Sequence, residues 1–340
     1  MKKFLLLENG NFYKVNMHSH TTLSDGKTTP EETKAAYKAM GYSAIAFTEH
    51  NWSFDVSYLN DEDFVAIRSY EYDIQNNHKQ LVEGKTSPNH IEHVHLNFFA
   101  KDPANGKVVC MAENKLPKKH PELMDLSQIV GEPNFKQEFN PDCLNKIIRT
   151  AKENGYLVVY NHPIWSLNEY PVYMSLEGLD GVEINNGFSN LDTDLDYTPY
   201  IYDYMLRKGK RLFCIAGDDN HRAEHFGLAW TMIKADALDQ KSLIEAVEKG
   251  NCYASDGPEI KELYFEDGYV TIKTSEAYGI YLTTVGRRSD RKLASKEGAP
   301  VTEATFKIYP NDAYFRLTVR DDHGKHANTR AFFLDEVGME

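Results

Sequence analysis

Several apolar runs that are typical of strands are each followed closely by a histidine or an acidic residue. This recurrence constrains the fold more than any other feature of the sequence. The run at 43–48 is followed by His50, and the run at 156–160 by His162. Helical signals separate such runs, and alternating strands and helices predict an α/β fold with a mostly parallel sheet or barrel. The carboxyl ends of parallel strands meet at one edge, where sites form in such folds. Scattered surface histidines would not follow this rule, so the sequence predicts a site at that edge.

Capping signals place the helices, and apolar runs place the strands. Thr29 is a preferred cap residue, Pro30 suits the first helical position, and Gly41 ends that helix. Further helices are expected at 141–154, 199–208 and 240–249, and strands at 12–17, 43–48, 64–70, 94–100, 156–160, 181–185 and 211–216.

The segment after the first of these strands carries His18, His20 and Asp25. Side chains alternate along a strand, so the two histidines point the same way and form a clamp for a divalent metal, to which Asp25 adds an oxygen ligand. A lone His-x-His is common and carries no meaning; the further candidates at other strand ends favour metal. The predicted ligands are His18, His20, Asp25, His50, Glu71, His95, His162, Asp219 and His221.

Two choices within this set rest on side-chain direction. Asp219 is preferred to Asp218 because it shares a strand face with His221, so Asp218 is expected to accept hydrogen bonds behind the site. His95 is chosen over His93, although both lie on one face, and that choice stays open. The remaining histidines are expected to be surface or supporting residues: His78, His90, His120, His225, His323 and His326.

The size and chemistry of the set predict two or three metal ions. Nine ligands are too many for one ion, since a typical site uses about four protein ligands. No thiolate is among them, which favours Zn, Mn or Fe in a site of imidazoles and carboxylates.

Composition excludes several classes of function. The formal net charge is −13, which disfavours nucleic acid, and the basic stretches at 115–120 and 287–292 are short and interpreted as solvated loops. No apolar run is long enough to span a bilayer, and 4–7 is too short for a signal peptide. The four widely spaced cysteines suit reduced thiols in a cytoplasmic protein. We expect a small-molecule substrate; the oligomeric state stays open.

The pattern changes near 255–258, which predicts two domains, 1–257 and 258–340. Beyond the boundary, Asp267-Gly268 sits in a hairpin signal, alternating runs follow, and no helix is evident, so a small all-β, sandwich-like domain is expected. The long polar stretches at 73–92 and 101–140 are equally compatible with a lid or substrate wall and with a surface excursion.

The ordered motifs resemble those of the PHP (polymerase and histidinol phosphatase) superfamily of metal-dependent phosphoesterases, over about residues 16–257. The motifs are His18-Ser19-His20 with Ser24-Asp25-Gly26, Thr48-Glu49-His50-Asn51, Glu71, His162-Pro163 and Gly217-Asp218-Asp219-Asn220-His221. The resemblance implies a distorted seven-stranded (β/α) barrel with a trinuclear metal centre, followed here by the C-terminal β domain.

The resemblance also implies how the ligands are shared. One ion would be held by His18, His20, Glu71 and Asp219, a second by Glu71, His95 and His162, and a third by Asp25, His50 and His221. Asp218 and Glu49 depart from the usual pattern at positions that are not metal ligands in the family. The ending at 250–258, with Asn51 after His50, is similar to that of stand-alone members, which include a branch of carbamate and amide hydrolases.

These observations lead to one preferred function and two alternatives. The preferred function is hydrolysis of a small phosphomonoester by a metal-activated water, with Glu71, Asp219 and His221 as catalytic residues and Arg222 steadying the phosphate or leaving oxyanion. Arg222 is at least as well explained as a surface arginine in a polar turn. The alternatives are a carbamate, amide or ester hydrolase with the same site, and a non-catalytic metal-binding accessory module. The acidic charge and the complete ligand set argue against the last.

Overall fold

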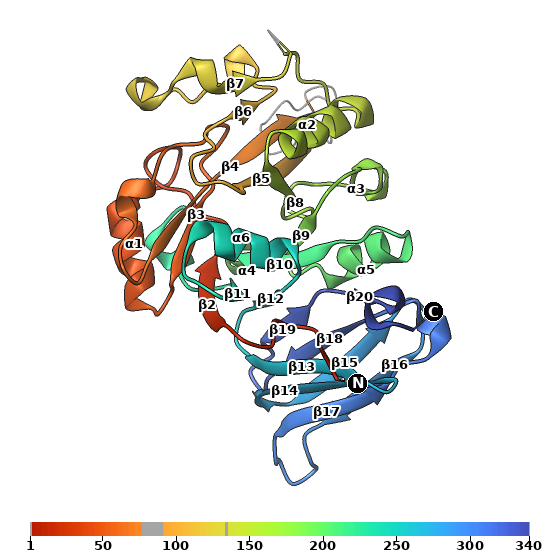
Figure 1. Cartoon of the computed structure of the whole chain (residues 1–340). Coiled ribbons are helices and arrows are strands. Elements are labelled where there is room, and N and C mark those ends of the chain that lie inside the picture. Colours follow the sequence, from red (N-terminus) through yellow and green to blue (C-terminus); the bar gives the residue numbers. More distant parts are fainter. Residues whose placement is uncertain (1, 77–90, 133–134, 340) are drawn as a thin grey trace.

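The chain folds as a mixed α/β protein with one large mixed sheet and few helices (Figure 1). The computed structural model describes residues 2–76, 91–132 and 135–339. His78, His90 and most of the polar stretch at 73–92 therefore lie outside the described residues. No helix in the described ranges is long and apolar enough to cross a membrane.

Seven strands of the large sheet carry the segments that were predicted to hold the site. In sheet order they are β10 (Phe213–Gly217), β9 (Gly181–Asn186), β8 (Tyr156–Tyr160), β5 (His93–Ala100), β4 (Val65–Gln75), β3 (Ala44–Phe47) and β2 (Asn11–Asn16). Each begins or ends close to its predicted position, except that β4 continues to Gln75 rather than stopping at Tyr70. Apolar runs bounded by polar residues thus located all seven.

The prediction of a mostly parallel sheet needs one correction, because β5 runs antiparallel to both β4 and β8. The other neighbours, β2 with β3, β3 with β4, β8 with β9 and β9 with β10, are parallel. A strand that returns beside its predecessor pairs antiparallel without needing a crossover helix. The amino end of β5, with His95, consequently lies at the edge where the parallel strands have their carboxyl ends.

The first and last of these strands meet just beyond their carboxyl ends. Ser19, after β2, forms an isolated parallel bridge with Asn220, after β10. The amide of His20 donates to the Asn220 carbonyl (3.1 Å), and the amide of Asp219 donates to the His18 carbonyl (2.8 Å). These bonds hold two of the predicted ligand segments side by side.

Four helices occupy the predicted positions: α1 (Pro30–Ala39), α2 (Pro141–Glu153), α5 (Pro199–Arg207) and α6 (Gln240–Glu248). At α1 the cap is a full capping box, in which the Thr29 side chain accepts from the Glu32 amide and the Glu32 side chain accepts from the Thr29 amide. The short helices α3 (Tyr170–Ser175) and α4 (Gly187–Thr193) were not predicted, because one or two turns give no clear periodicity.

The second half of the large sheet was only partly predicted. It continues from β2 through β11 (Trp230–Ala235), β12 (Cys252–Ser255), β19 (His326–Thr329), β18 (Tyr314–Arg320), β15 (Gly279–Thr284) and β16 (Ser289–Leu293), and β20 (Phe332–Phe333) pairs with β18. A second, four-stranded sheet has the order β1 (Lys3–Phe4), β13 (Ile260–Glu266), β14 (Tyr269–Ala277) and β17 (Val301–Lys307). No α-helix occurs in the described residues after 257, as predicted.

The strands after residue 257 pack around an apolar cluster of their own, to which the N-terminus also contributes. Leu5 and Leu6 are buried in that cluster, and β1 pairs with β13. Both chain termini accordingly lie beside this part in Figure 1. The large sheet nevertheless runs through the predicted boundary by the pairing of β12 with β19. The division into 1–257 and 258–340 stays a prediction.

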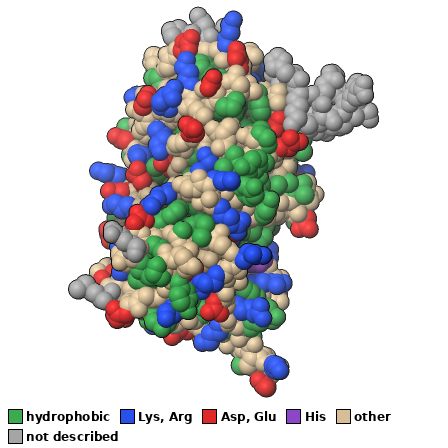
Figure 2. Space-filling view, turned by 90° about the vertical axis from the view of Figure 1, so that its right-hand side faces the viewer, with side chains coloured by type: hydrophobic (Ala, Val, Ile, Leu, Met, Phe, Trp, Pro, Cys, Tyr) green, Lys and Arg blue, Asp and Glu red, His purple; other side chains and the backbone are tan. Residues whose placement is uncertain are grey.

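Figure 2 shows hydrophobic side chains gathered on the face that lies to the right in Figure 1, where α3 and α5 are found. Tyr170 and Tyr200 are exposed there, and each ring packs against Tyr204 (centroids 5.0 and 5.9 Å apart).

Candidate metal centre

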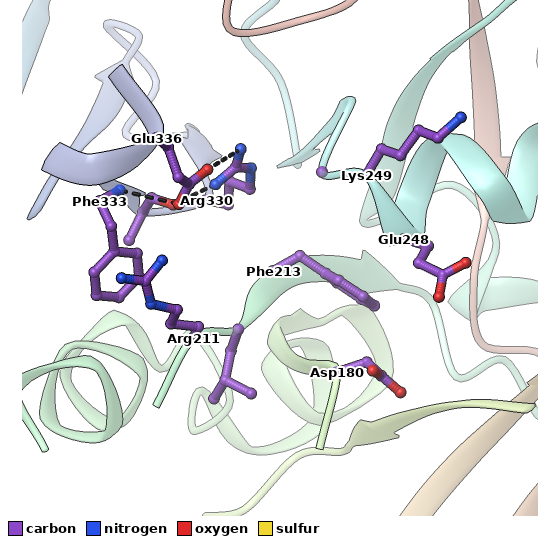
Figure 3. Close-up of a pocket in the computed structure, with 11 residues that line it drawn as sticks. Asp180, Arg211, Phe213, Glu248, Lys249, Arg330, Phe333 and Glu336 are labelled. Atoms are coloured by element: carbon purple, nitrogen blue, oxygen red, sulfur yellow. Dashed lines mark hydrogen bonds and ion pairs between the residues drawn. The ribbon is translucent and has the colours of Figure 1, made fainter. Parts of the chain in front are cut away.

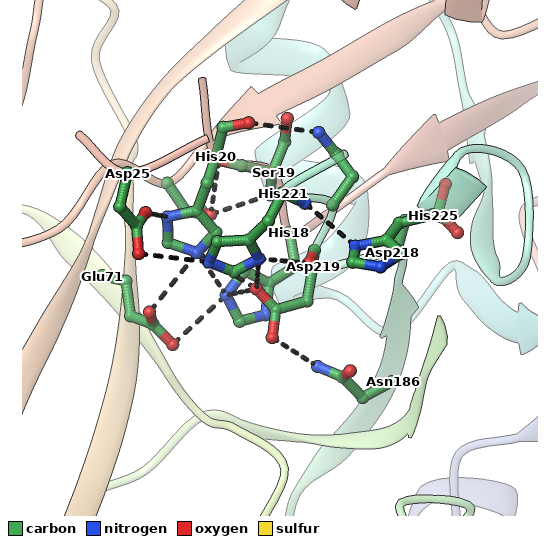
Figure 4. A network of polar contacts seen from close by, with 12 residues as sticks. His18, Ser19, His20, Asp25, Glu71, Asn186, Asp218, Asp219, His221 and His225 are labelled. Atoms are coloured by element: carbon green, nitrogen blue, oxygen red, sulfur yellow. Dashed lines mark hydrogen bonds and ion pairs between the residues drawn. The ribbon is translucent and has the colours of Figure 1, made fainter. Parts of the chain in front are cut away.

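All nine predicted ligands lie within one cluster, at the edge of the sheet where the parallel strands have their carboxyl ends. Figure 4 shows six of them: His18, His20, Asp25, Glu71, Asp219 and His221. Glu71, at the end of the predicted part of β4, is the centre of the cluster. Its carboxylate oxygens lie 3.1–3.5 Å from ring nitrogens of five histidines: His18, His20, His50, His95 and His162. Glu71 is almost fully buried, and these contacts include at least one ligand of each of the three ions that the resemblance implies.

The second carboxylate, Asp219, lies between His18 and His20. Its Oδ1 is 3.3 Å from His18 Nε2 and 3.1 Å from His20 Nε2, and these two nitrogens are 3.3 Å apart. The other carboxylate oxygen accepts from Asn186 Nδ2 (3.1 Å). Three ligand atoms therefore face a common point.

Asp25, His50, His221 and His20 form the more open part of the cluster. Asp25 Oδ2 is 3.4 Å from His221 Nε2 and 3.6 Å from His50 Nε2, and Asp25 Oδ1 is 3.6 Å from His20 Nδ1. His20 thus faces Asp25 as well as Asp219, although the resemblance assigned it to the first ion alone. The side chains of His50 and His221 are 27% and 24% exposed, so this is the side of the cluster that faces solvent.

The donor set fits divalent cations. Asp219 Oδ1, His50 Nδ1 and His95 Nε2 are buried atoms without a hydrogen-bond partner in the described residues. His18 Nε2, His20 Nε2 and Asp219 Oδ1 converge within 3.3 Å, where lone pairs repel one another unless a proton or a metal ion lies between them. Imidazole nitrogens and carboxylate oxygens suit Zn, Mn or Fe. The cluster therefore has the composition and the unsatisfied atoms of a metal centre.

Electrostatics in the cluster favour added positive charge. Burial opposes ionisation of Glu71 and Asp219, but nearby histidines outweigh it and hold the pKa of each carboxyl well below its usual range, His95 and His18 for Glu71 and His18 and His20 for Asp219. Burial works against the charged form of His95 too, yet Glu71 and Asp73 raise its pKa to about 10. A field that retains protons on imidazole also attracts divalent cations, which compete with those protons.

His20 behaves in the opposite way. Burial, together with the imidazoles of His221 and His50, lowers its pKa to about 4. A neutral imidazole is the form that binds metal.

Three carboxylates that were not predicted as site residues support the ligands. Glu49 accepts from the Thr21 amide (3.0 Å) and the Ser24 hydroxyl, and so fixes the loop that carries Asp25. Asp73 Oδ1 lies 3.0 Å from His93 Nδ1 and 3.2 Å from His95 Nε2. The third, Glu183 on β9, accepts from His18 Nδ1 (3.0 Å).

The sequence carried a signal for two of these. Asp73 follows Glu71 at a spacing of two in a strand, which places both side chains on one face. Glu183 is an acid inside a buried apolar strand, where an unpaired carboxylate is costly.

Asp218 is buried behind the cluster, as predicted. Its carboxylate accepts from the Tyr37 hydroxyl (2.6 Å) and from the amides of Gly227, Leu228 and Ala229 (2.6–2.8 Å). Burial raises its pKa to about 6 against these hydrogen bonds. Asp218 thus anchors the turn before β11.

Arg222 contacts side chains that are not among the nine predicted ligands. The Arg222 guanidinium lies 3.1 Å from Asp192 and 3.2 Å from Glu224, and also contacts the His225 ring. His225 is buried, and its Nδ1 accepts from the His221 amide (3.2 Å). His225 therefore supports His221, while the substrate contact predicted for Arg222 stays a prediction.

The interpretation of the basic stretch at 115–120 as a solvated loop needs a correction. Lys115 Nζ is 3.5 Å from Asp73 Oδ2, and His120 Nε2 is 3.3 Å from the carbonyl of Thr22. Both side chains lie against residues that flank the cluster, so this part of the polar stretch at 101–140 borders the site. His323 lies in the turn before β19 and His326 lies in β19, so both are in the C-terminal part of the chain, as expected. The ring of His326 stacks on Tyr197.

Two aromatic rings also pack against the cluster, and neither was predicted. Trp165 packs edge-on against His162 (ring centroids 5.2 Å apart) and lies 5.8 Å from His95. Phe188 lies 5.4 Å from His221. They restrict the motion of these imidazoles.

A separate cavity of about 220 Å³ lies away from the cluster, beside the amino end of β10 (Figure 3). Arg211, Lys249 and Arg330 line it, but each of them is paired with a nearby acidic side chain. No predicted site residue lines this cavity.

Comparison with known proteins identifies no family model that matches the chain and no match among curated proteins. Solved structures do match. A two-domain protein of Bacteroides vulgatus containing a predicted PHP-like metal-dependent phosphoesterase is 14% identical, with a TM-score of 0.44, and the match covers 97% of this chain and 89% of that one.

Two further structures match a smaller part of the chain. An amidohydrolase of Chromobacterium violaceum, determined with bound sulfate and no metal, is 15% identical (TM-score 0.43), and the match covers 69% of this chain and 96% of that one. A Bifidobacterium adolescentis protein described as a metal-dependent phosphoesterase is 14% identical (TM-score 0.38; 61% and 87% covered). Of these similar solved structures, one contains a predicted PHP-like metal-dependent phosphoesterase and another is described as a metal-dependent phosphoesterase.

Proposed function

We propose that this protein is a metal-dependent hydrolase and that its substrate is a small phosphomonoester. The observation that carries the proposal is the convergence of His18, His20 and Asp219 on one point, with a buried Asp219 oxygen that has no hydrogen-bond partner among the residues that the structure describes. Such an arrangement is costly in a folded protein unless a cation binds there.

The proposed centre holds two or three Zn, Mn or Fe ions on the nine predicted ligands, shared as the resemblance to the PHP superfamily implies. When bound, these ions supply the Lewis-acid charge that makes a phosphoester hydrolysable by water at neutral pH. The proposal includes a distorted seven-stranded barrel over 1–257, which the pairing of Ser19 with Asn220 supports. It also includes a separate β domain over 258–340, which the apolar cluster of the C-terminal strands supports.

The residues of the chain have distinct tasks in this centre. Glu71 contacts five imidazoles and so sets their spacing, and Asp219 orients His18 and His20. In this proposal the open side, with Asp25, His50 and His221, admits the substrate, and His221 contacts the reacting group. The buried side, with Glu71 and His162, excludes water from the rest of the cluster.

Charge favours a phosphomonoester over a neutral carbamate or amide. The ligands include three carboxylates, Asp25, Glu71 and Asp219, with a total charge of −3, whereas three divalent ions, if all are bound, carry +6. The positive surplus stabilises a dianion and its transition state more than a neutral substrate.

The test is a substrate panel on protein loaded with Zn, Mn or Fe. We expect turnover of aryl and alkyl phosphomonoesters. Glu71→Gln should lower kcat/KM by orders of magnitude, because the amide cannot hold the same histidines. The matched control is Asp218→Asn, a neighbouring buried carboxylate that faces away from the cluster, and it should have a much smaller effect.

Two outcomes would change the assignment. Turnover of an aryl carbamate or anilide without any phosphomonoesterase activity would replace the phosphoesterase with the amide-hydrolase alternative. No turnover of either class, with metal fully bound, would leave a non-catalytic metal-binding module.

A further inference from the structure

Strand β9 supplies none of the nine predicted ligands, yet its carboxyl end lies inside the cluster. Every other strand of the seven is followed by a predicted ligand or carries one. The end of β9 instead carries Glu183 and Asn186, both buried and both in contact with ligand-bearing segments. This contrast calls for a different role for β9.

The Glu183 carboxylate contacts segments from two other strands. Oε1 accepts from Nδ1 of His18, after β2, at 3.0 Å. Oε2 accepts from the backbone amide of His162, after β8, at 3.2 Å, and from Asn186 Nδ2 at 3.0 Å. One buried side chain thus fixes a ring and a backbone segment that belong to different predicted metal groups.

Asn186 extends this network to a third segment. Its Nδ2 also lies 3.1 Å from Asp219 Oδ2, after β10. Its Oδ1 accepts from the Ser189 amide (2.9 Å), which makes the side-chain orientation unambiguous: oxygen toward α4 and nitrogen toward the carboxylates. Glu183 and Asn186 together hold His18, His162 and Asp219.

The contact with His18 has a specific chemical consequence. A carboxylate accepts hydrogen bonds, so His18 carries a proton on Nδ1 and presents the Nε2 lone pair when the ring is neutral. Nε2 is the atom that faces Glu71 (3.2 Å) and Asp219 (3.3 Å). Without Glu183, the ring could take the other tautomer or rotate, and Nε2 would no longer be a ready ligand.

We propose that Glu183 is a positioning residue for the metal centre: it selects the His18 tautomer and aligns the ligand segments after β2 and β8. This inference rests on the proposed metal centre, but not on which substrate is hydrolysed. Partners of this kind raise metal affinity by about 10- to 100-fold.

The test compares wild-type protein with Glu183→Ala and Glu183→Gln after metal removal. Cobalt(II) is added back, and its visible absorption and its competition with a coloured chelator give the affinity and the ligand geometry. We expect Glu183→Ala to bind the ion about 10- to 100-fold more weakly with an altered spectrum. Glu183→Gln keeps an acceptor of the same length and should recover part of this loss.

A second measurement addresses the tautomer directly. In zinc-loaded protein labelled with nitrogen-15 in histidine, the His18 ring should show a protonated Nδ1 in the wild type. That signal should be lost or exchange-broadened in Glu183→Ala. A role confined to packing would leave the His18 Nδ1 proton as protected from exchange as in the wild type.

Asp203→Asn serves as the control for a general loss of stability. Asp203 is a buried carboxylate that pairs with Arg316 and contacts no residue of the cluster in the described part of the chain. This variant should unfold more easily but bind cobalt with wild-type affinity and spectrum.

Wild-type affinity and spectrum in Glu183→Ala would overturn the inference, even if the protein is an active phosphoesterase. If Glu183→Ala does not fold, Glu183→Met decides, because it keeps the side-chain length without a strong acceptor: wild-type cobalt affinity and His18 signals in that variant overturn the inference. Conversely, if no substrate is ever hydrolysed, weaker cobalt binding in Glu183→Ala still supports the inference while the proposed function fails.

Discussion

The buried ion pair between Arg316 on β18 and Asp203 on α5 allows a quantitative prediction about how the C-terminal strands attach to the rest of the chain. The guanidinium donates to both carboxylate oxygens, at 2.6 and 2.7 Å, and also to Thr318 Oγ1 at 2.9 Å. Their side chains are only 5% and 11% exposed. Removing one partner therefore leaves a charge in a poorly solvated place.

Arg316→Met and Asp203→Asn should each lower the free energy of unfolding by about 3–5 kcal/mol, the cost of an uncompensated buried charge. The double variant Asp203→Leu/Arg316→Met should be within about 1–2 kcal/mol of the wild type, because apolar side chains can replace a buried pair. With an m-value near 3 kcal/mol/M, each single variant shifts the urea midpoint by about 1–2 M.

Urea unfolding followed by two probes measures this effect. All three tryptophans, Trp52, Trp165 and Trp230, precede residue 258, so fluorescence reports on the first part, whereas far-ultraviolet circular dichroism reports on both. Coincident transitions would show that the two parts unfold together. A loss below about 1 kcal/mol in both single variants, or a double variant no better than the singles, would refute the reasoning that the pair is desolvated.

Three further predictions concern the metal centre and the fold. Protein purified without chelator should contain two or three equivalents of Zn, Mn or Fe by elemental analysis, and a reproducible value below one after incubation with these metals would contradict a multinuclear centre. Inorganic phosphate should inhibit phosphomonoester hydrolysis competitively, whereas chloride at matched ionic strength should not. Thr29→Ala removes the cap of α1 and should lower the free energy of unfolding by about 1 kcal/mol, measured in urea, while Thr29→Ser should retain most of it.

Local information in the sequence was sufficient to locate most of the ligand-bearing strands and the longer helices. The period of apolar residues and the caps depend on neighbours within a few positions, so the strand before His162 and the helix after Thr29 could be predicted from their own residues. The candidate ligands were likewise recognisable, because polar metal-binding side chains directly after buried strands form an ordered pattern.

The tertiary structure decided what depends on contacts between distant segments. The direction of β5, the position of His20 between Asp219 and Asp25, and the pairing of β1 with β13 have no local signal, since each arises from partners far along the chain. The same holds for Glu183: its sequence neighbours show only an acid in a strand, and its contact with His18 exists because β9 and β2 deliver their ends to one buried place. Such long-range contacts determine the structure of the site, because a buried polar atom away from bulk water needs a partner that the folded chain or a bound ion supplies.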